Sequence, residues 1–117
     1  MEDYLIREID RIGELLACIA SKLGLGSMPE RSEVLARELN SELVKALDVD
    51  YEALLAMPAP IEYLVVEKEF TNANLEELAV MMYRSVPASD VLNGFLSEVT
   101  AYLDHQGVFS FVLHSAF

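Results

Sequence analysis

A seam of apolar residues in the first part of the chain constrains the fold more than any other feature. Its members recur at alternating steps of four and three residues: Leu5, Ile9, Ile12, Leu16, Ile19 and Leu23. This spacing places all of them on one face of an α-helix. The seam covers only about three heptads, which is short for a free-standing coiled coil. It therefore predicts a helix from Asp3 to Leu23 that packs inside its own bundle.

Further helical patterns follow along the chain. Ser32 is placed to cap a helix that ends near Leu47, and Asp50 to cap a short helix over Tyr51–Met57. The expected buried stripe of the longer helix has a period of 3.6 residues and comprises Leu35, Leu39, Leu43 and Leu47, widened by Val34 and Val44. This helix and the first one should form an antiparallel hairpin.

Two more helices are predicted in the second half. One should be capped by Asn72 or Asn74 and end near Arg84, and the other should run from Val91 to about His105 behind a cap at Ser89 or Asp90. Their expected inner faces are Leu75, Leu78, Ala79 and Met82 in the first, and Leu92, Phe95, Leu96, Val99 and Leu103 in the second.

Two segments fit either a helix or a strand. Residues 61–70 combine a helical apolar pattern with the strand propensity of Tyr63–Val66. We favour a helix because no second strand is evident to pair with it. The very apolar tail, residues 108–117, fits a short helix that begins near Ser110. The expected fold is therefore all-α: one domain over residues 1–117, a bundle of about six helices.

Composition limits the class of protein. Hydrophobic residues make up 53% of the 117 residues, which is enough for a core and too many for a disordered chain. The longest apolar run, Leu78–Tyr83, is far shorter than the roughly 20 residues of a membrane helix. Cys18 is the single cysteine, so no internal disulfide can form, and a reducing, cytoplasmic setting is expected.

Charge is strongly acidic and uneven. The net charge is −12, of which residues 46–117 carry −9 with only Lys68 and Arg84 as bases. Such a surface repels nucleic-acid phosphates and anionic lipids, so neither partner is expected. A basic protein partner would fit, although an acidic face that keeps an apolar chain dispersed explains the charge as well.

The second half resembles a tetratricopeptide repeat, a helical hairpin of about 34 residues. Leu75, Leu78, Ala79 and Phe95 match the spacing of that pattern, whereas Met82 and Val91 depart from it. The resemblance implies tetratricopeptide-like helical hairpins. One repeat is too few for a solenoid.

The whole chain also resembles a group of small, uncharacterised all-helical bacterial proteins. The residues that carry this resemblance are Asp3-Tyr4-Leu5-Ile6-Arg7-x-Ile9, Asn74-Leu75-Glu76-Glu77-Leu78-Ala79 and Phe109-Ser110-Phe111. It implies the same kind of helical fold and no activity, cofactor or functional residue.

Asp104, His105 and His114 are the best candidates for chemistry. A histidine beside a carboxylate can act as a general base, and two histidines with an aspartate can hold a metal. Their spacing matches no standard zinc pattern, and a favourable histidine at a helix C-terminus explains His105 equally well. No catalytic, metal or cofactor residue is therefore assigned.

Other chemically capable residues have simpler explanations. Cys18 should be a small buried or half-buried hydrophobe, with Lys22 as its only basic neighbour on the helix. The acidic group Glu67, Glu69, Glu76 and Glu77 should be a solvated face, because it lacks the alternating ligands and glycine of a Ca²⁺ loop. Ser110 lacks the sequence context of a nucleophilic serine, and the five tyrosines should mainly pack against the core.

These patterns predict a non-catalytic helical interaction module whose partner is a protein segment or a second copy of itself. The tail Val108–Phe117 is the expected contact segment, because a small chain this rich in apolar residues leaves some of them uncovered. Two alternatives remain open. One is a small metal protein or enzyme that uses Asp104, His105 and His114, and the other is an acidic inhibitor of a basic protein.

Overall fold

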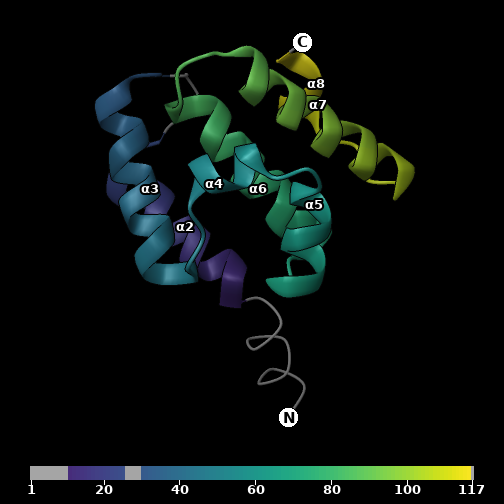
Figure 1. Ribbon diagram of the computed structural model, residues 1–117, viewed down its shortest axis with the longest axis horizontal. Helices are drawn as coiled ribbons and strands as arrows, with labels where there is room; N and C mark the ends of the chain where they lie inside the picture. The colour runs from purple at the N-terminus through teal and green to yellow at the C-terminus, as the bar shows by residue number, and fades with distance from the viewer. Residues whose placement is uncertain (1–10, 26–29, 117) are drawn as a thin grey trace.

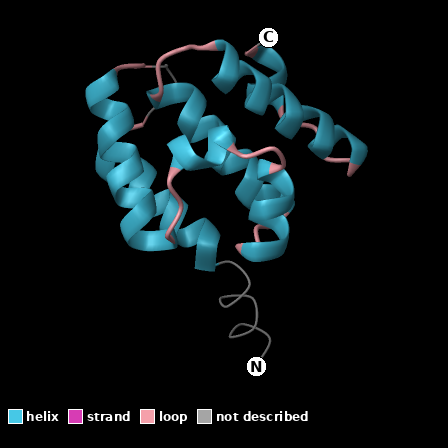
Figure 2. Ribbon diagram, in the orientation of Figure 1, coloured by secondary structure: helices cyan, strands magenta, loops and turns pink. Residues whose placement is uncertain are grey.

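The computed structural model describes residues 11–25 and 30–116, and these residues form helices and no strands (Figure 2). The elements are α2 (Arg11–Leu23), α3 (Glu33–Leu47), α4 (Tyr51–Ala56), α5 (Pro60–Glu62), the π-helix η1 (Tyr63–Glu67), α6 (Asn72–Ser85), α7 (Asp90–His105) and α8 (Phe111–Ser115). The all-α fold class is confirmed.

Helix α6 is the centre of the bundle. It contacts α2 and α3 on one side and α7 and α8 on the other, while α4 and α5 pack against α7 (Figure 1). The apolar faces predicted for α6 and α7 are confirmed, because all nine of those side chains are at most 4% exposed. The residues of the tetratricopeptide-like pattern lie in this shared core.

The described part of the seam, which lies on α2, packs against other helices of the same chain. Leu16 and Ile19 are buried, and Ile12 and Leu23 pack against the core from its edge. Helix α2 contacts both α3 and α6. Leu5, Ile9 and the predicted helix start at Asp3 lie outside the described residues.

One part of the predicted core of α3 is wrong. Val34 and Val44 are 65% and 43% exposed, whereas Ala36 is buried with Leu39 and Leu43. The buried arc of α3 is therefore narrower than the sequence pattern indicates. Its centre lies on the Ala36 side, where the small alanine side chain lets neighbouring helices come close.

Helix caps fix most boundaries. Ser32, Asp50, Ser89 and Ser110 each accept a backbone N–H of the following turn, as expected from the sequence. The cap of α6 differs from the prediction. Thr71 caps this helix by accepting the Asn74 N–H, and the Thr71 N–H in turn donates to the Asn74 side-chain oxygen in a capping box.

Residues 61–67 of the ambiguous segment 61–70 are helical, as favoured, but Tyr63–Glu67 form a π-helix. The Lys68 N–H donates to the Tyr63 carbonyl at 3.2 Å, one residue further back than in an α-helix. Glu69 then adopts a left-handed conformation with φ 58°. This wider turn returns Phe70 to the core, where it is only 4% exposed.

The start of α3 is tied to the end of α6. The backbone N–H groups of Glu30 and Ser32 donate to the carbonyls of Arg84 and Ser85 at 2.9 Å and 3.1 Å. Arg31 lies between them and donates from Nε to the Tyr83 carbonyl at 2.7 Å. These bonds satisfy carbonyls of the last turn of α6, which have no partner within the helix.

Candidate functional site

The C-terminal element presents two large aromatic side chains to solvent. Phe109 and Phe111 are 65% and 76% exposed, the two largest side chains among the exposed hydrophobic residues that the structure describes. We call them the aromatic pair. A single exposed apolar residue is ordinary, but two phenylalanines two positions apart need an explanation.

The inward side of α8 explains why the pair faces outward. Leu113 is fully buried, and the buried Ser110 accepts the Leu113 N–H at 3.3 Å as the cap of this helix. Residues three apart lie on the same face of a helix. Because Ser110 and Leu113 face the core, Phe111 between them faces away from it.

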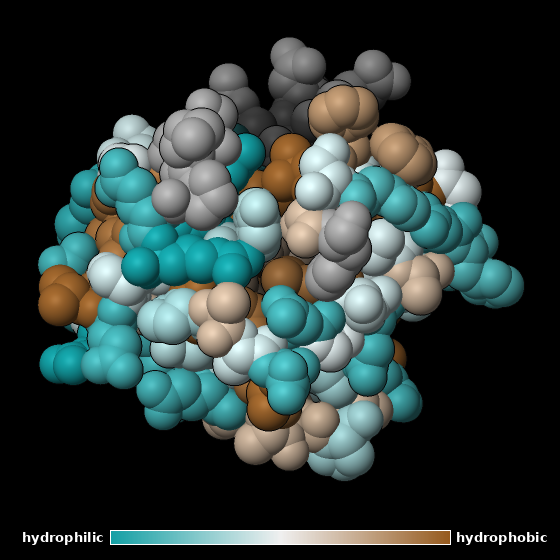
Figure 3. All heavy atoms as spheres, turned by 90° about the horizontal axis from the view of Figure 1, so that it is seen from above, coloured by the Kyte–Doolittle hydropathy of each residue, from teal (hydrophilic) through white to brown (hydrophobic). Residues whose placement is uncertain are grey.

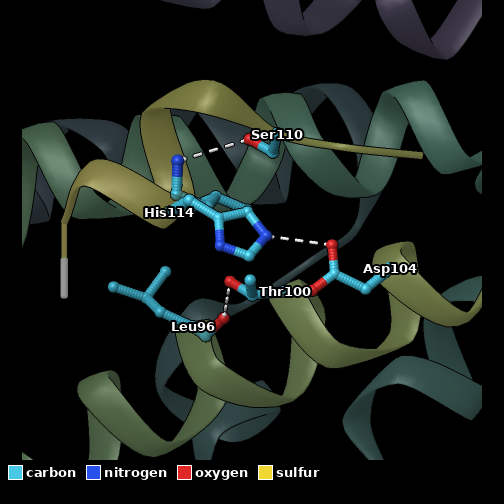
Figure 4. A network of polar contacts seen from close by, with 6 residues as sticks. Leu96, Thr100, Asp104, Ser110 and His114 are labelled. Atoms are coloured by element: carbon cyan, nitrogen blue, oxygen red, sulfur yellow. Dashed lines mark hydrogen bonds and ion pairs between the residues drawn. The ribbon is translucent and has the colours of Figure 1, made fainter. Parts of the chain in front are cut away.

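A second contact holds α8 to α7. The imidazole Nε2 of His114 lies 2.9 Å from Oδ1 of Asp104, and Figure 4 shows the ring projecting from α8 towards this carboxylate on α7. The His114 ring also stacks against the Phe109 ring, with the two centroids 4.4 Å apart and an angle of 8° between the ring planes. His114 therefore fixes the position of Phe109.

The structure brings together only part of the predicted triad. Asp104 and His114 meet, but His105 is exposed and makes no hydrogen bond or ion pair with any residue in the described part of the chain. Within residues 11–25 and 30–116, no three or more histidine, cysteine, aspartate or glutamate side chains are grouped so that they could hold a metal ion. The Asp104–His114 pair lies on the surface and has a structural role at α8.

The environment predicted for Cys18 is wrong. Its side chain is exposed and lines an open hollow between α2 and α3, beside Glu42 and Ala46. Lys22, its expected activating neighbour, instead forms an ion pair with Glu42 at 3.0 Å. Lys22 therefore ties α2 to α3.

The acidic residues around the turn do not share one environment. Glu67 and Glu69 are exposed, as expected of a solvated face, whereas Glu76 and Glu77 in the first turn of α6 are half-buried. The tyrosines mainly pack against the core, as expected: Tyr51 is buried, and Tyr63, Tyr83 and Tyr102 pack at its edge.

The elbow between α3 and α4 is the most polar cluster of the described residues. The Asn40 side chain donates to Asp50 Oδ1 at 3.1 Å and accepts the Tyr51 N–H at 2.8 Å. The hydrogen bond from Asn40 is the main cause that lowers the pKa of Asp50. Burial raises the pKa of Tyr51, which lines an open hollow of about 370 Å³ beside Glu33 and Arg37. These bonds fix the elbow and leave no nucleophile or base poised for chemistry.

The fold and the aromatic pair define a small all-helical protein with a presented apolar surface. No family model, curated protein or solved structure matches the chain in a comparison with each of these sets. The comparisons therefore support neither the tetratricopeptide resemblance nor a bacterial origin. In the described part of the chain, the helices are too short or too polar for any of them to cross a bilayer.

Proposed function

We propose that this chain is a non-catalytic protein-interaction module that associates with a second copy of itself through the aromatic pair. The observation that carries the proposal is the exposure of Phe109, which precedes α8, and of Phe111, its first residue, while Leu113 and His114 hold this helix to the core and to α7. A flexible tail could bury such residues by folding back. Here Leu113 and His114 keep them outward.

The exposed area of the aromatic pair sets the free energy that its burial can contribute to association. Two phenylalanines at this exposure leave on the order of 250 Å² of aromatic surface in water, worth roughly 6 kcal/mol when buried. Association costs at least about 4 kcal/mol in lost freedom of motion. The balance supports a weak, concentration-dependent complex, so measurements belong at high protein concentration.

The two exposed phenylalanines fit an interaction through a few anchors. In Figure 3, hydrophobic groups on the visible face are interspersed with hydrophilic ones. Fully buried anchors inside a polar rim are the usual source of binding energy at protein interfaces. The single cysteine adds support for a reducing compartment such as the cytoplasm.

Sedimentation velocity over a range from about 10 µM to 1 mM, where weak complexes of this kind form, tests the proposal. The native protein should gain mass with concentration, and the double variant Phe109→Ser/Phe111→Ser should remain monomeric. The matched control is Val34→Ser/Val66→Ser, because these valines are 65% and 64% exposed on other helices. It should associate like the native protein.

Two results would overturn the proposal. The first is a native protein that stays monomeric over the whole range. The second is a valine control that loses association as fully as the phenylalanine variant, since general surface stickiness would then explain both.

A further inference from the structure

A basic hollow lies at the other end of the molecule. It has a volume of about 440 Å³ and forms where the start of α2, the end of α3 and the segment after η1 meet. The residues that matter for its chemistry are Arg11, Lys45 and Lys68 as cations and Leu15, Val44 and Phe70 as apolar walls. We call this feature the basic hollow.

The charge of this hollow is opposite to that of the protein. Three of the chain's eight lysines and arginines line it, together with one acidic residue, Asp48. Lys68 Nζ lies 3.5 Å from Asp48 Oδ2. Arg11 and Lys45 are exposed and form no ion pair with the residues that the structure describes. The hollow therefore carries a local positive charge on a chain with a net charge of −12.

The shape of the hollow favours a protein side chain over a free small molecule. Sites for small molecules usually bury 70–90% of their ligand. The basic hollow is open to solvent, and two of its three cations, Arg11 and Lys45, are exposed. When the bound group is an aromatic side chain of another protein, the surface of that protein covers the open side of the hollow. The face of an aromatic ring also attracts cations.

The aromatic pair has the matching chemistry. Phe109 stacks on His114, whose imidazole lies 2.9 Å from the negatively charged Asp104 side chain. Figure 1 places α8 at the upper edge of the molecule and the start of α2 at the lower edge. One copy therefore cannot insert its own aromatic pair into its own basic hollow.

Charge also opposes the alternative in which two aromatic pairs meet face to face. That arrangement would bring two Asp104 carboxylates together, and like charges repel. Contact between the aromatic pair of one copy and the basic hollow of another brings opposite charges together instead. We propose that copies of this chain associate head to tail, with Phe109 and Phe111 of one copy seated in the basic hollow of the next.

This proposal rests on the proposed function and adds a partner surface to it. A head-to-tail contact leaves one aromatic pair and one basic hollow free at the ends of every assembly. The native protein should therefore form a ladder of oligomers whose mean mass keeps rising with concentration. Face-to-face contact would stop at the dimer.

A complementation experiment tests the head-to-tail arrangement. One variant, Phe109→Ser/Phe111→Ser, lacks the aromatic pair, and the other, Arg11→Glu/Lys45→Glu, has a reversed hollow but keeps the Lys68–Asp48 ion pair. Each variant alone should be monomeric in sedimentation velocity. An equimolar mixture should form a complex of two copies and nothing larger, because only one productive contact remains.

The charge control is Arg37→Glu, which reverses an exposed cation outside the basic hollow. It should associate like the native protein. Circular dichroism and thermal melting of every variant should match those of the native protein, since all substituted side chains are exposed.

Each other outcome has a distinct meaning. If the native protein associates but the mixture stays monomeric, the head-to-tail arrangement is wrong and the proposed function stands. If the variant with the reversed hollow associates like the native protein, or the charge control loses association equally, the basic hollow is not the partner surface. If the native protein is monomeric throughout, both proposals fail.

Discussion

The guanidinium of Arg31 lies 4.4 Å from the centre of the Tyr83 ring, while its Nε donates to the Tyr83 carbonyl at 2.7 Å. One side chain thus binds both the ring and the backbone of the same residue, 52 positions away in the sequence. The contact joins the α2–α3 hairpin to the end of the central helix α6.

Replacing Arg31 should therefore weaken the whole fold. Arg31→Ala is expected to lower the free energy of unfolding by about 2 kcal/mol, through loss of a charge-assisted hydrogen bond and a cation–π contact. Arg31→Lys should recover only part of this, because an ammonium group cannot reproduce the planar guanidinium stack. Urea titration followed by circular dichroism measures both. Arg37→Ala is the control, since its 3.9 Å surface pair with Glu33 should contribute less than about 0.5 kcal/mol.

The central helix offers a test of the core. Leu78 is fully buried on α6, so Leu78→Ala should cost about 2–5 kcal/mol. Val66→Ala, at a position that is 64% exposed, should change stability by less than about 0.5 kcal/mol. Equal losses in the two variants would contradict the position of α6 at the centre of the bundle.

Stability should depend on pH through the α3–α4 elbow. The Asn40 hydrogen bond holds the pKa of Asp50 below its usual value. A lowered carboxyl pKa stabilises the fold above about pH 4, the value in the unfolded chain, and this contribution is lost as the pH falls through the lower folded value. Asn40→Ala should therefore lose less stability than the native protein between pH 5 and pH 2.5 in urea titrations. An unchanged acid-side slope would show that Asn40 does not set this pKa.

The contact between His114 and Asp104 should govern the ordering of α8 more than global stability. Both side chains are partly exposed, so the pair is worth less than about 1 kcal/mol overall. His114→Ala should speed hydrogen exchange at the α8 amides and cleavage after Phe109 by chymotrypsin. His105→Ala should change neither, because the His105 side chain is exposed and forms no hydrogen bond or ion pair with the residues that the structure describes. Faster exchange in both variants would argue against a specific role for His114.

Periodic patterns were sufficient to predict the helices and most of the core. The stripes of α6 and α7 were correct because a 3.6-residue repeat of large apolar side chains leaves one way to bury them. The exposure of Val34 and Val44 could not be predicted in this way. Their burial depends on how far the neighbouring helices wrap around α3, which is a tertiary property.

Details of the backbone conformation could not be predicted from the apolar pattern either. The sequence of residues 61–70 favours a helix, but the wide turn at Tyr63 follows from the need to return Phe70 to the core. Thr71 and Asn74 are both good helix-start residues. Only the reciprocal bonds of the capping box show which of them is the cap.

The candidate site was predictable as a segment and not as a set of residues. The apolar tail indicated an uncovered surface, and Ser110 with Leu113 at the next turn was the available signal for which residues face inward. No pattern in the sequence indicated the basic hollow. Arg11 lies on α2, Lys45 on α3 and Lys68 just after η1, and only the packing of these three parts of the fold brings them to one place.

Because α8 is short, the proposed association through the aromatic pair would require the chain to be folded. A five-residue helix is far below the length of about 12–15 residues at which an isolated helix begins to persist in water. It depends on Leu113 remaining in the core, so an unfolded or partly unfolded copy would no longer present its aromatic pair and would leave the proposed assembly. Conversely, each bound neighbour adds to the stability of the copies that it contacts, by about 2.7 kcal/mol when its concentration reaches one hundred times the dissociation constant.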